Sequence, residues 1–105
     1  MDIEALHQFA ITLGNVEDCQ PFGPDTIVYK TNGKMFLLLA INESPLRFNV
    51  KCNPELAQEL RENHSSILPG YHMNKKHWNT IIVDTSLTQK QLKSFIKHSF
   101  DLVNK

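Results

Sequence analysis

Apolar residues recur at helical spacing at both ends of the chain and form shorter runs between them. The first helix is predicted from apolar positions three and four apart, at Ile3, Leu6, Phe9, Ala10 and Leu13. Asp2 can cap its first turn, and Gly14 can end it. The closing helix begins at a capping box formed by Thr88 and Gln91 and runs to Val103, with its apolar residues on one side.

The middle of the chain contains segments that are typical of β-strands. They are residues 16–20, 26–31, 35–41, 46–52 and 77–84. Asn32-Gly33 separates the second segment from the third and predicts a tight hairpin, because both turn positions require positive φ. The third segment is continuously apolar, which predicts a central strand covered on both faces. In the fourth segment, alternation puts Arg47, Asn49 and Lys51 on one face.

Another helix is predicted to follow the fourth strand segment. Asn53 can cap this helix, Pro54 suits its first position, and it should end near Asn63. Residues 65–76 are predicted to be irregular, since Pro69-Gly70 interrupts them. The order α, β meander, α, β, α predicts one α+β domain over the whole chain, residues 1–105. In this fold an antiparallel sheet of about five strands is packed on one face by N-terminal, middle and C-terminal helices.

The formal net charge of the 105 residues is zero, but the charge is unevenly distributed along the sequence. Residues 1–70 contain five Lys or Arg against nine Asp or Glu, a net charge of −4. Residues 71–105 contain six Lys against two Asp, a net charge of +4. Such a split predicts an anionic partner for the C-terminal third.

Two observations predict where the protein works. No segment approaches the roughly 18 consecutive apolar residues that span a bilayer, so no membrane partner is expected. The first four residues include two acids where a secretory signal carries Lys or Arg. The protein is therefore expected to be cytoplasmic.

The residue types that usually carry catalysis or bind metal do not form a known pattern. Cys19 and Cys52 lie 33 positions apart and are interpreted as free thiols, and His64, His72 and His77 match no zinc spacing. We therefore expect no metal, no cofactor and no enzymatic activity. A thiol-dependent enzyme is a remote alternative, because Cys52 precedes a predicted helix N-terminus that would favour a thiolate. It would need one of these histidines beside the sulfur.

The basic residues of the C-terminal third are the best functional candidates. Lys90, Lys93 and Lys97 share one face of the closing helix, and Lys75 and Lys76 follow the Pro-Gly turn. A lysine stripe of this kind can neutralise phosphates. It is also the ordinary solvated face of an amphipathic helix. A protein-interaction or regulatory module that uses the sheet face or the loop 71–78 therefore stays open as the alternative.

Three stretches together resemble the MmcQ/YjbR family of small bacterial proteins. They are the helix start at 53–57, the loop 69–78 with its Asn-Lys-Lys-His-Trp core, and the β run that closes on Asp84. The resemblance covers essentially the whole chain and implies a frataxin-like fold. The family is labelled as DNA-binding through a double-wing motif, so the turns at 32–33 and 42–45 would be the two hairpin ends.

The resemblance and the basic residues together predict a non-enzymatic DNA-binding protein. Its nucleic-acid-binding residues are predicted to be Lys34, His72, Asn74, Lys75, Lys76, His77, Lys90 and Lys93. The lysines would hold phosphates, Asn74 and His77 would add hydrogen bonds, and Lys34 would contribute from a wing. Asn74 and Trp78 are also expected to fasten their loop to the sheet.

Overall fold

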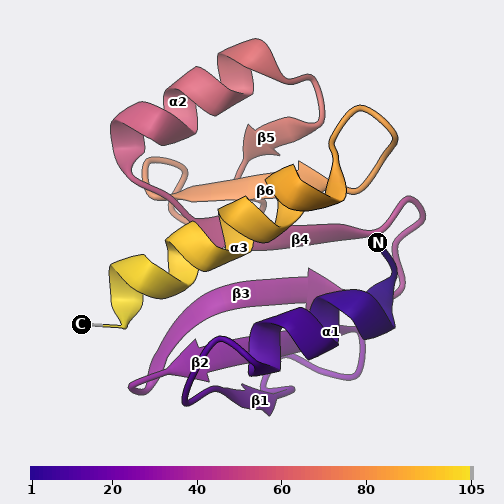
Figure 1. Ribbon diagram of the computed structural model, residues 1–105, viewed down its shortest axis with the longest axis vertical. Helices are drawn as coiled ribbons and strands as arrows, with labels where there is room; N and C mark the ends of the chain where they lie inside the picture. The colour runs from indigo at the N-terminus through magenta and orange to yellow at the C-terminus, as the bar shows by residue number, and fades with distance from the viewer. Residues whose placement is uncertain (105) are drawn as a thin grey trace.

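The computed structural model describes residues 1–104, which form a six-stranded antiparallel sheet with three helices on one face (Figure 1). The helices are α1 (Ile3–Ile11), α2 (Pro54–Asn63) and α3 (Gln89–Val103). The strands are β1 (Glu17–Cys19), β2 (Thr26–Thr31), β3 (Lys34–Ala40), β4 (Arg47–Lys51), β5 (Ile67–Pro69) and β6 (Trp78–Ile82). They lie in the order β1-β2-β3-β4-β6-β5, which confirms the predicted α+β class.

The local signals for helix starts are confirmed by hydrogen bonds. The Asp2 carboxylate accepts from the Ala5 N–H at 2.8 Å, and the Asn53 side chain accepts from the first turn of α2. Thr88 and Gln91 form the predicted capping box at the start of α3. Each cap satisfies N–H groups that have no partner within the helix, so these residues fix where the helices begin.

The hairpin between β2 and β3 turns at Asn32 and Gly33, as predicted. Their φ angles are 54° and 74°, both in the left-handed region that this turn requires. A register shift follows between Tyr29 and Lys30, where β3 bulges. The hairpin tip lies beside the end of α3, because the Asn104 side chain accepts from Thr31 and Asn32 at 3.1 and 3.2 Å.

The main core lies between the sheet and the helices. Leu37 and Leu39 of β3 stand opposite Val50 and Phe48 of β4, so all four project toward α3. Phe100 of α3 meets Phe36 edge-to-face at 5.3 Å. The helices and these buried apolar side chains all lie on one face of the sheet, and no helix covers the other face among residues 1–104 (Figure 1). We call this other face the helix-free face.

The sheet has six strands rather than about five, and the additional strand is β5. Its three residues pair with β6, with Ile67 opposite Ile81 and Pro69 opposite Asn79. This segment lies within residues 65–76, which were wrongly predicted to be irregular throughout. Three residues ending in Pro are too short for a period-two pattern, and only pairing with β6 makes them a strand. The two edges of the sheet, β1 and β5, are thus both three residues long.

The helix-free face carries a second, smaller apolar cluster. It consists of Val28, Leu38 and Trp78, with Met35 and Met73 packed against it. Trp78 is only 8% exposed, which agrees with its predicted role as an anchor of its loop. The cluster adjoins a cleft on the same face, because Leu38 and Met73 also line that cleft.

Candidate functional site

The loop between β5 and β6, residues 70–77, is fastened at its base. The Gly70 N–H donates to the Trp78 carbonyl at 2.9 Å, and the Asn74 carbonyl accepts from the N–H groups of His77 and Trp78. A Cβ atom on Gly70 would lie 2.7 Å from the Trp78 Cβ, so only glycine fits there. These contacts confirm that Asn74 and Trp78 fasten the loop to the sheet.

The first half of this loop lies over the helix-free face. The Tyr71 N–H donates to Thr80 Oγ1 at 3.0 Å, and Asn49 Nδ2 donates to the Tyr71 carbonyl at 3.3 Å. Thr80 in turn donates to Asn49 Oδ1 at 2.6 Å. The network therefore holds Tyr71 over β4 and β6, and the adjacent His72 ring lies 4.0 Å from the Tyr71 ring, centroid to centroid.

The second half of the loop turns toward α2. Arg61 of α2 donates to the Lys75 carbonyl and, at 2.6 Å, to Asn79 Oδ1. Lys75 Nζ donates to the Gly70 carbonyl at 3.0 Å, while Lys76 is exposed and its N–H donates to Asn74 Oδ1. The loop is therefore held from both faces of the sheet. No sequence pattern indicated the role of Arg61.

His77 has a structural position in the loop. Its carbonyl accepts from the Cys52 N–H at 2.8 Å, and its own N–H donates to Asn74. These bonds join the end of the loop to the end of β4. Of the predicted site residues, Asn74 and His77 therefore hold the loop in place, whereas Lys76 stands free on its outer side.

The register of the sheet brings further lysines, which were not predicted as binding residues, to the same end of the sheet as the loop. Lys51, at the end of β4, stands opposite Trp78 on the helix-free face. Lys30, near the end of β2, stands opposite Met35 on one side and Glu17 on the other. Lys34 begins β3 at the same end of the sheet. We call Lys30, Lys34, Lys51, Lys75 and Lys76 the sheet-end lysines.

The predicted lysines of α3 lie elsewhere. The end of α3 reaches the β2–β3 hairpin tip through Asn104, so Lys90, in the first turn, lies roughly 20 Å away along the helix axis. The Lys93 Nζ sits 5.6 Å above the Phe9 ring, and Lys97 pairs with Asp101 at 2.7 Å. The predicted lysines thus form two groups rather than one stripe. Lys105, part of the basic third, lies outside the described residues.

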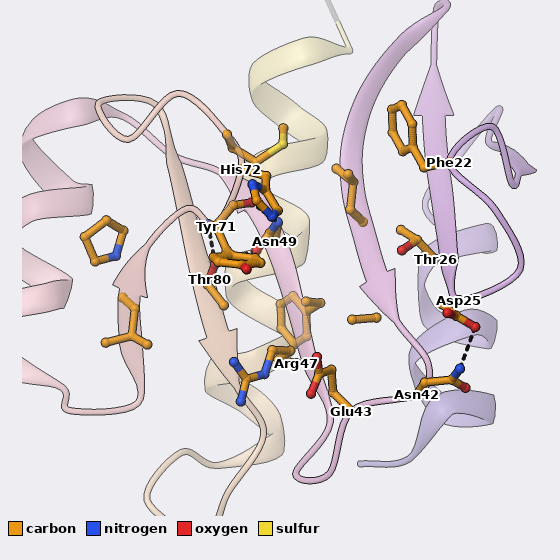
Figure 2. Close-up of a pocket in the computed structure, with 16 residues that line it drawn as sticks. Phe22, Asp25, Thr26, Asn42, Glu43, Arg47, Asn49, Tyr71, His72 and Thr80 are labelled. Atoms are coloured by element: carbon orange, nitrogen blue, oxygen red, sulfur yellow. Dashed lines mark hydrogen bonds between the residues drawn. The ribbon is translucent and has the colours of Figure 1, made fainter.

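The helix-free face is hollowed into a cleft of about 780 Å³. Figure 2 shows Tyr71 and His72 on one side of it and Phe22 on the other. Arg47 of β4 also lines the cleft, and its Nε atom is buried without a hydrogen-bond partner among residues 1–104. His72 therefore belongs to this cleft rather than to the sheet-end lysines. The cleft was not predicted, because its walls come from segments far apart in the chain.

The cysteine that could have been a nucleophile is buried. Burial raises the pKa of the Cys52 thiol, although the nearby Arg61 guanidinium acts in the opposite direction. Cys52 lines an apolar cleft of about 320 Å³ between α2 and α3, together with His98. None of the three histidines named for thiol chemistry lines that cleft, so the predicted thiol arrangement is not brought together there. A thiol held in its protonated form is a poor nucleophile.

Two further properties of residues 1–104 concern other kinds of site. Within this range, no three His, Cys, Asp or Glu side chains lie where they could jointly hold a metal ion. None of the helices in the same range is both long and apolar enough to cross a membrane.

The sequence and the fold place the chain in a known family. The family model named YjbR matches residues 11–102. The chain belongs to the YjbR family. The chain is 36% identical over 107 residues to the uncharacterized protein YbdF of Escherichia coli O157:H7, and the match covers 98% of this chain and 88% of YbdF.

Solved structures share the YjbR-family fold described above. The crystal structure of Deinococcus radiodurans protein DR2400, which contains the domain DUF419, superposes with a TM-score of 0.92 at 36% identity. It covers 99% of this chain and 79% of DR2400. A Pseudomonas syringae protein superposes with a TM-score of 0.84 at 30% identity, over 98% of this chain and 99% of its own.

Proposed function

We propose that this YjbR-family protein is a non-enzymatic DNA-binding module that contacts phosphates with the sheet-end lysines. The observation that carries the proposal is the gathering of five lysines, from β2, β3, β4 and the β5–β6 loop, at one end of the sheet. Lysines that neutralise phosphates provide most of the affinity in sequence-independent DNA binding.

The spacing of these lysines suits a phosphate backbone. Lys30 on β2 and Lys51 on β4 are two strands apart on the same face, a separation of about 10 Å. Lys75 uses one of its three ammonium hydrogens on the Gly70 carbonyl, which leaves two for a phosphate. Because the loop is held from both faces of the sheet, the backbone of Lys75 and Lys76 needs little ordering when they bind.

The two hairpin ends of a double-wing arrangement differ in charge here. The tip at Asn32-Gly33 carries Lys34, whereas the turn at the opposite end carries Glu43 and lies beside Asp25. Phosphates are repelled by the second end. We therefore propose that DNA approaches the lysine end, with the β2–β3 hairpin as the contacting wing.

A pair of charge-matched variants tests this proposal. Binding of a short labelled DNA duplex is measured by fluorescence anisotropy over a range of salt concentrations. The variant Lys34→Ala/Lys76→Ala is expected to reduce the slope of log K against log salt by about 0.9 for each phosphate that the protein no longer neutralises. The control Lys90→Ala/Lys93→Ala removes the same charge from α3 and is expected to keep the slope.

Two results would contradict the proposal. One is no binding of the wild-type protein at low salt. The other is an equal reduction in both double variants, which would mean that only total charge matters. Unchanged thermal unfolding of each variant establishes that the lysines act on binding and not on the fold.

A further inference from the structure

The cleft on the helix-free face carries an unusual concentration of exposed apolar surface. Among residues 1–104, four large hydrophobic side chains are exposed, and three of them line this cleft. Phe22 is 64% exposed, Tyr71 is 68% exposed and Leu68 is 41% exposed. Exposed apolar side chains that cluster around one concavity mark a binding site more often than single ones do.

A cation without a partner lies in the same cleft. The Arg47 Nε atom is buried and has no hydrogen-bond partner among residues 1–104, where the one ion pair joins Lys97 and Asp101. Buried polar groups are nearly always hydrogen-bonded, so the unpaired guanidinium donor of Arg47 is expected to find an acceptor in a bound ligand. Guanidinium groups bind carboxylates through two parallel hydrogen bonds, which makes a carboxylate the matching acceptor.

The aromatic wall is held in a costly conformation. His72 has a φ of 59°, in the left-handed region that non-glycine residues rarely adopt. Asn49 and Thr80 hold the preceding residue, Tyr71, from the strands beneath, so the loop cannot relax without breaking that network. Backbone strain that the surroundings maintain tends to occur at ligand-binding positions. Here it places two rings side by side over the cleft (Figure 2).

The charges in the cleft limit what can bind. Asp25 and Glu43 line it together with Arg47, and the Asp25 carboxylate accepts from Asn42. The two acids and the arginine give the lining a formal charge of −1, which repels a dianionic phosphate more strongly than a monocarboxylate. The volume of about 780 Å³ lies in the range of small-molecule sites.

We propose that this cleft binds a small aromatic monocarboxylate. Arg47 takes the carboxylate, and the ring packs against the aromatic wall of Tyr71 and His72, with Phe22 on the opposite side. None of the sheet-end lysines lines the cleft, so the inference is independent of the proposed DNA contacts. Ligand binding and DNA binding can accordingly succeed or fail separately.

An NMR titration with matched probes tests the proposal. Phenylacetate is added to ¹⁵N-labelled protein and compared with phenylacetamide, which has the same ring but no charge, and with inorganic phosphate. Phenylacetate is expected to shift the amide signals of Thr26, Leu38, Ala40 and Thr80 in a saturable way. Phenylacetamide is expected to bind about tenfold more weakly or worse, because it leaves Arg47 without an anion.

Variants assign the two parts of the ligand. Arg47→Met is expected to weaken phenylacetate binding by about tenfold or more, and Arg47→Lys to restore part of it. Tyr71→Ala, in an exposed position where folding should not suffer, is expected to weaken phenylacetate binding as well. Lys93→Met is the control that removes a positive charge outside the cleft and should leave binding unchanged.

Several outcomes would overturn the inference. They are the absence of saturable shifts with phenylacetate, equal binding of the amide, tighter binding of phosphate, and a folded Arg47→Met variant that binds as well as the wild type. Wild-type dispersion in the spectrum of each variant shows that it is folded.

Discussion

The Nε atom of Arg61 donates a 2.6 Å hydrogen bond to Oδ1 of Asn79, a side chain that is only 1% exposed. Asn79 Nδ2 donates in turn to the Ala57 carbonyl at 3.4 Å, and the Arg61 guanidinium also reaches the Lys75 carbonyl. This pair therefore joins α2, β6 and the β5–β6 loop, and it links the loop to the helical side of the sheet.

Replacing Asn79 with alanine should destabilise the protein strongly. The change leaves the partly buried Arg61 donor without its acceptor, which costs about 2–3 kcal/mol in the free energy of unfolding. Urea unfolding measures this loss. Asp101→Ala is the control, because it breaks only the exposed pair with Lys97 and should cost less than about 1 kcal/mol. Equal losses in the two variants would contradict the role given to Asn79.

Gly70→Ala should loosen the β5–β6 loop. The added methyl group would lie 2.7 Å from the Trp78 Cβ and 3.0 Å from the Trp78 carbonyl oxygen, and neither atom belongs to a flexible chain end. We expect a loss of about 1–3 kcal/mol in the free energy of unfolding. Amide hydrogen exchange should rise in residues 70–78 but not in α3. Unchanged exchange in that loop would mean that the backbone accommodates the methyl group.

The stability of the protein should fall at high pH because of Tyr29. Burial, with the Asp18 charge as a smaller contribution, raises the pKa of Tyr29 to about 12. The unfolded chain releases this proton at about pH 10. The contribution of Tyr29 is therefore complete below about pH 10 and is lost as the pH rises through about 12.

Tyr29→Phe tests this dependence directly. The variant loses the 2.8 Å hydrogen bond between the Tyr29 hydroxyl and His7 Nδ1, which should cost about 1 kcal/mol near neutral pH. Urea unfolding of both proteins from about pH 9 to 11.5 should show a smaller decline in the variant, since it has no buried hydroxyl to ionise. Parallel declines would show that other groups cause the loss.

Acid titration should reveal the environment of Asp84. Hydrogen bonds from the hydroxyl of Ser66, and then from Ser86, lower the pKa of this carboxyl. Because the folded-state pKa is lower than that of the unfolded chain, the stabilisation is present above the unfolded pKa and disappears as the pH falls through the folded value.

Ser66→Ala should raise the pKa of Asp84, as measured by NMR of its carboxyl carbon during acid titration. Ser94→Ala is the matched control, because its hydroxyl donates to the Gln91 carbonyl rather than to an acid. An Asp84 pKa that stays the same in Ser66→Ala would mean that Ser86 and the backbone alone determine it.

Features that depend on neighbouring residues in the sequence could be predicted. The Asn32-Gly33 turn and the Asn53 and Thr88 caps each rest on residues within four consecutive positions, and the structure confirms all of them. The alternation in β4 likewise gave the shared face of Arg47, Asn49 and Lys51, which the register with β6 confirms. Strand β5 had no such signal, because it exists only through its pairing with β6.

The sites could be predicted only in part, because they depend on register and on distant contacts. The place of Lys30 beside the other sheet-end lysines follows from the register of β2 against β3, which the sequence does not specify. Arg61 holds the loop through the carbonyl of Lys75, which is 14 residues away in the sequence. Phe22 and Tyr71 are also far apart in the sequence, and only the fold brings them to the same cleft. In α3, by contrast, the helical spacing correctly predicted that the lysines share one face. It did not show that Lys90 and Lys93 lie far from the β2–β3 hairpin, which contacts the other end of the helix.

The short strands at both margins of the sheet have a consequence for behaviour at high concentration. An outer strand with many unpaired N–H and C=O groups invites a second molecule to extend the sheet, which is a common start of aggregation. With only three residues in β1 and in β5, and with a proline closing the latter, each margin offers few positions for such growth. The short edges therefore limit growth of the sheet by edge pairing, even though one sheet face is open and partly apolar.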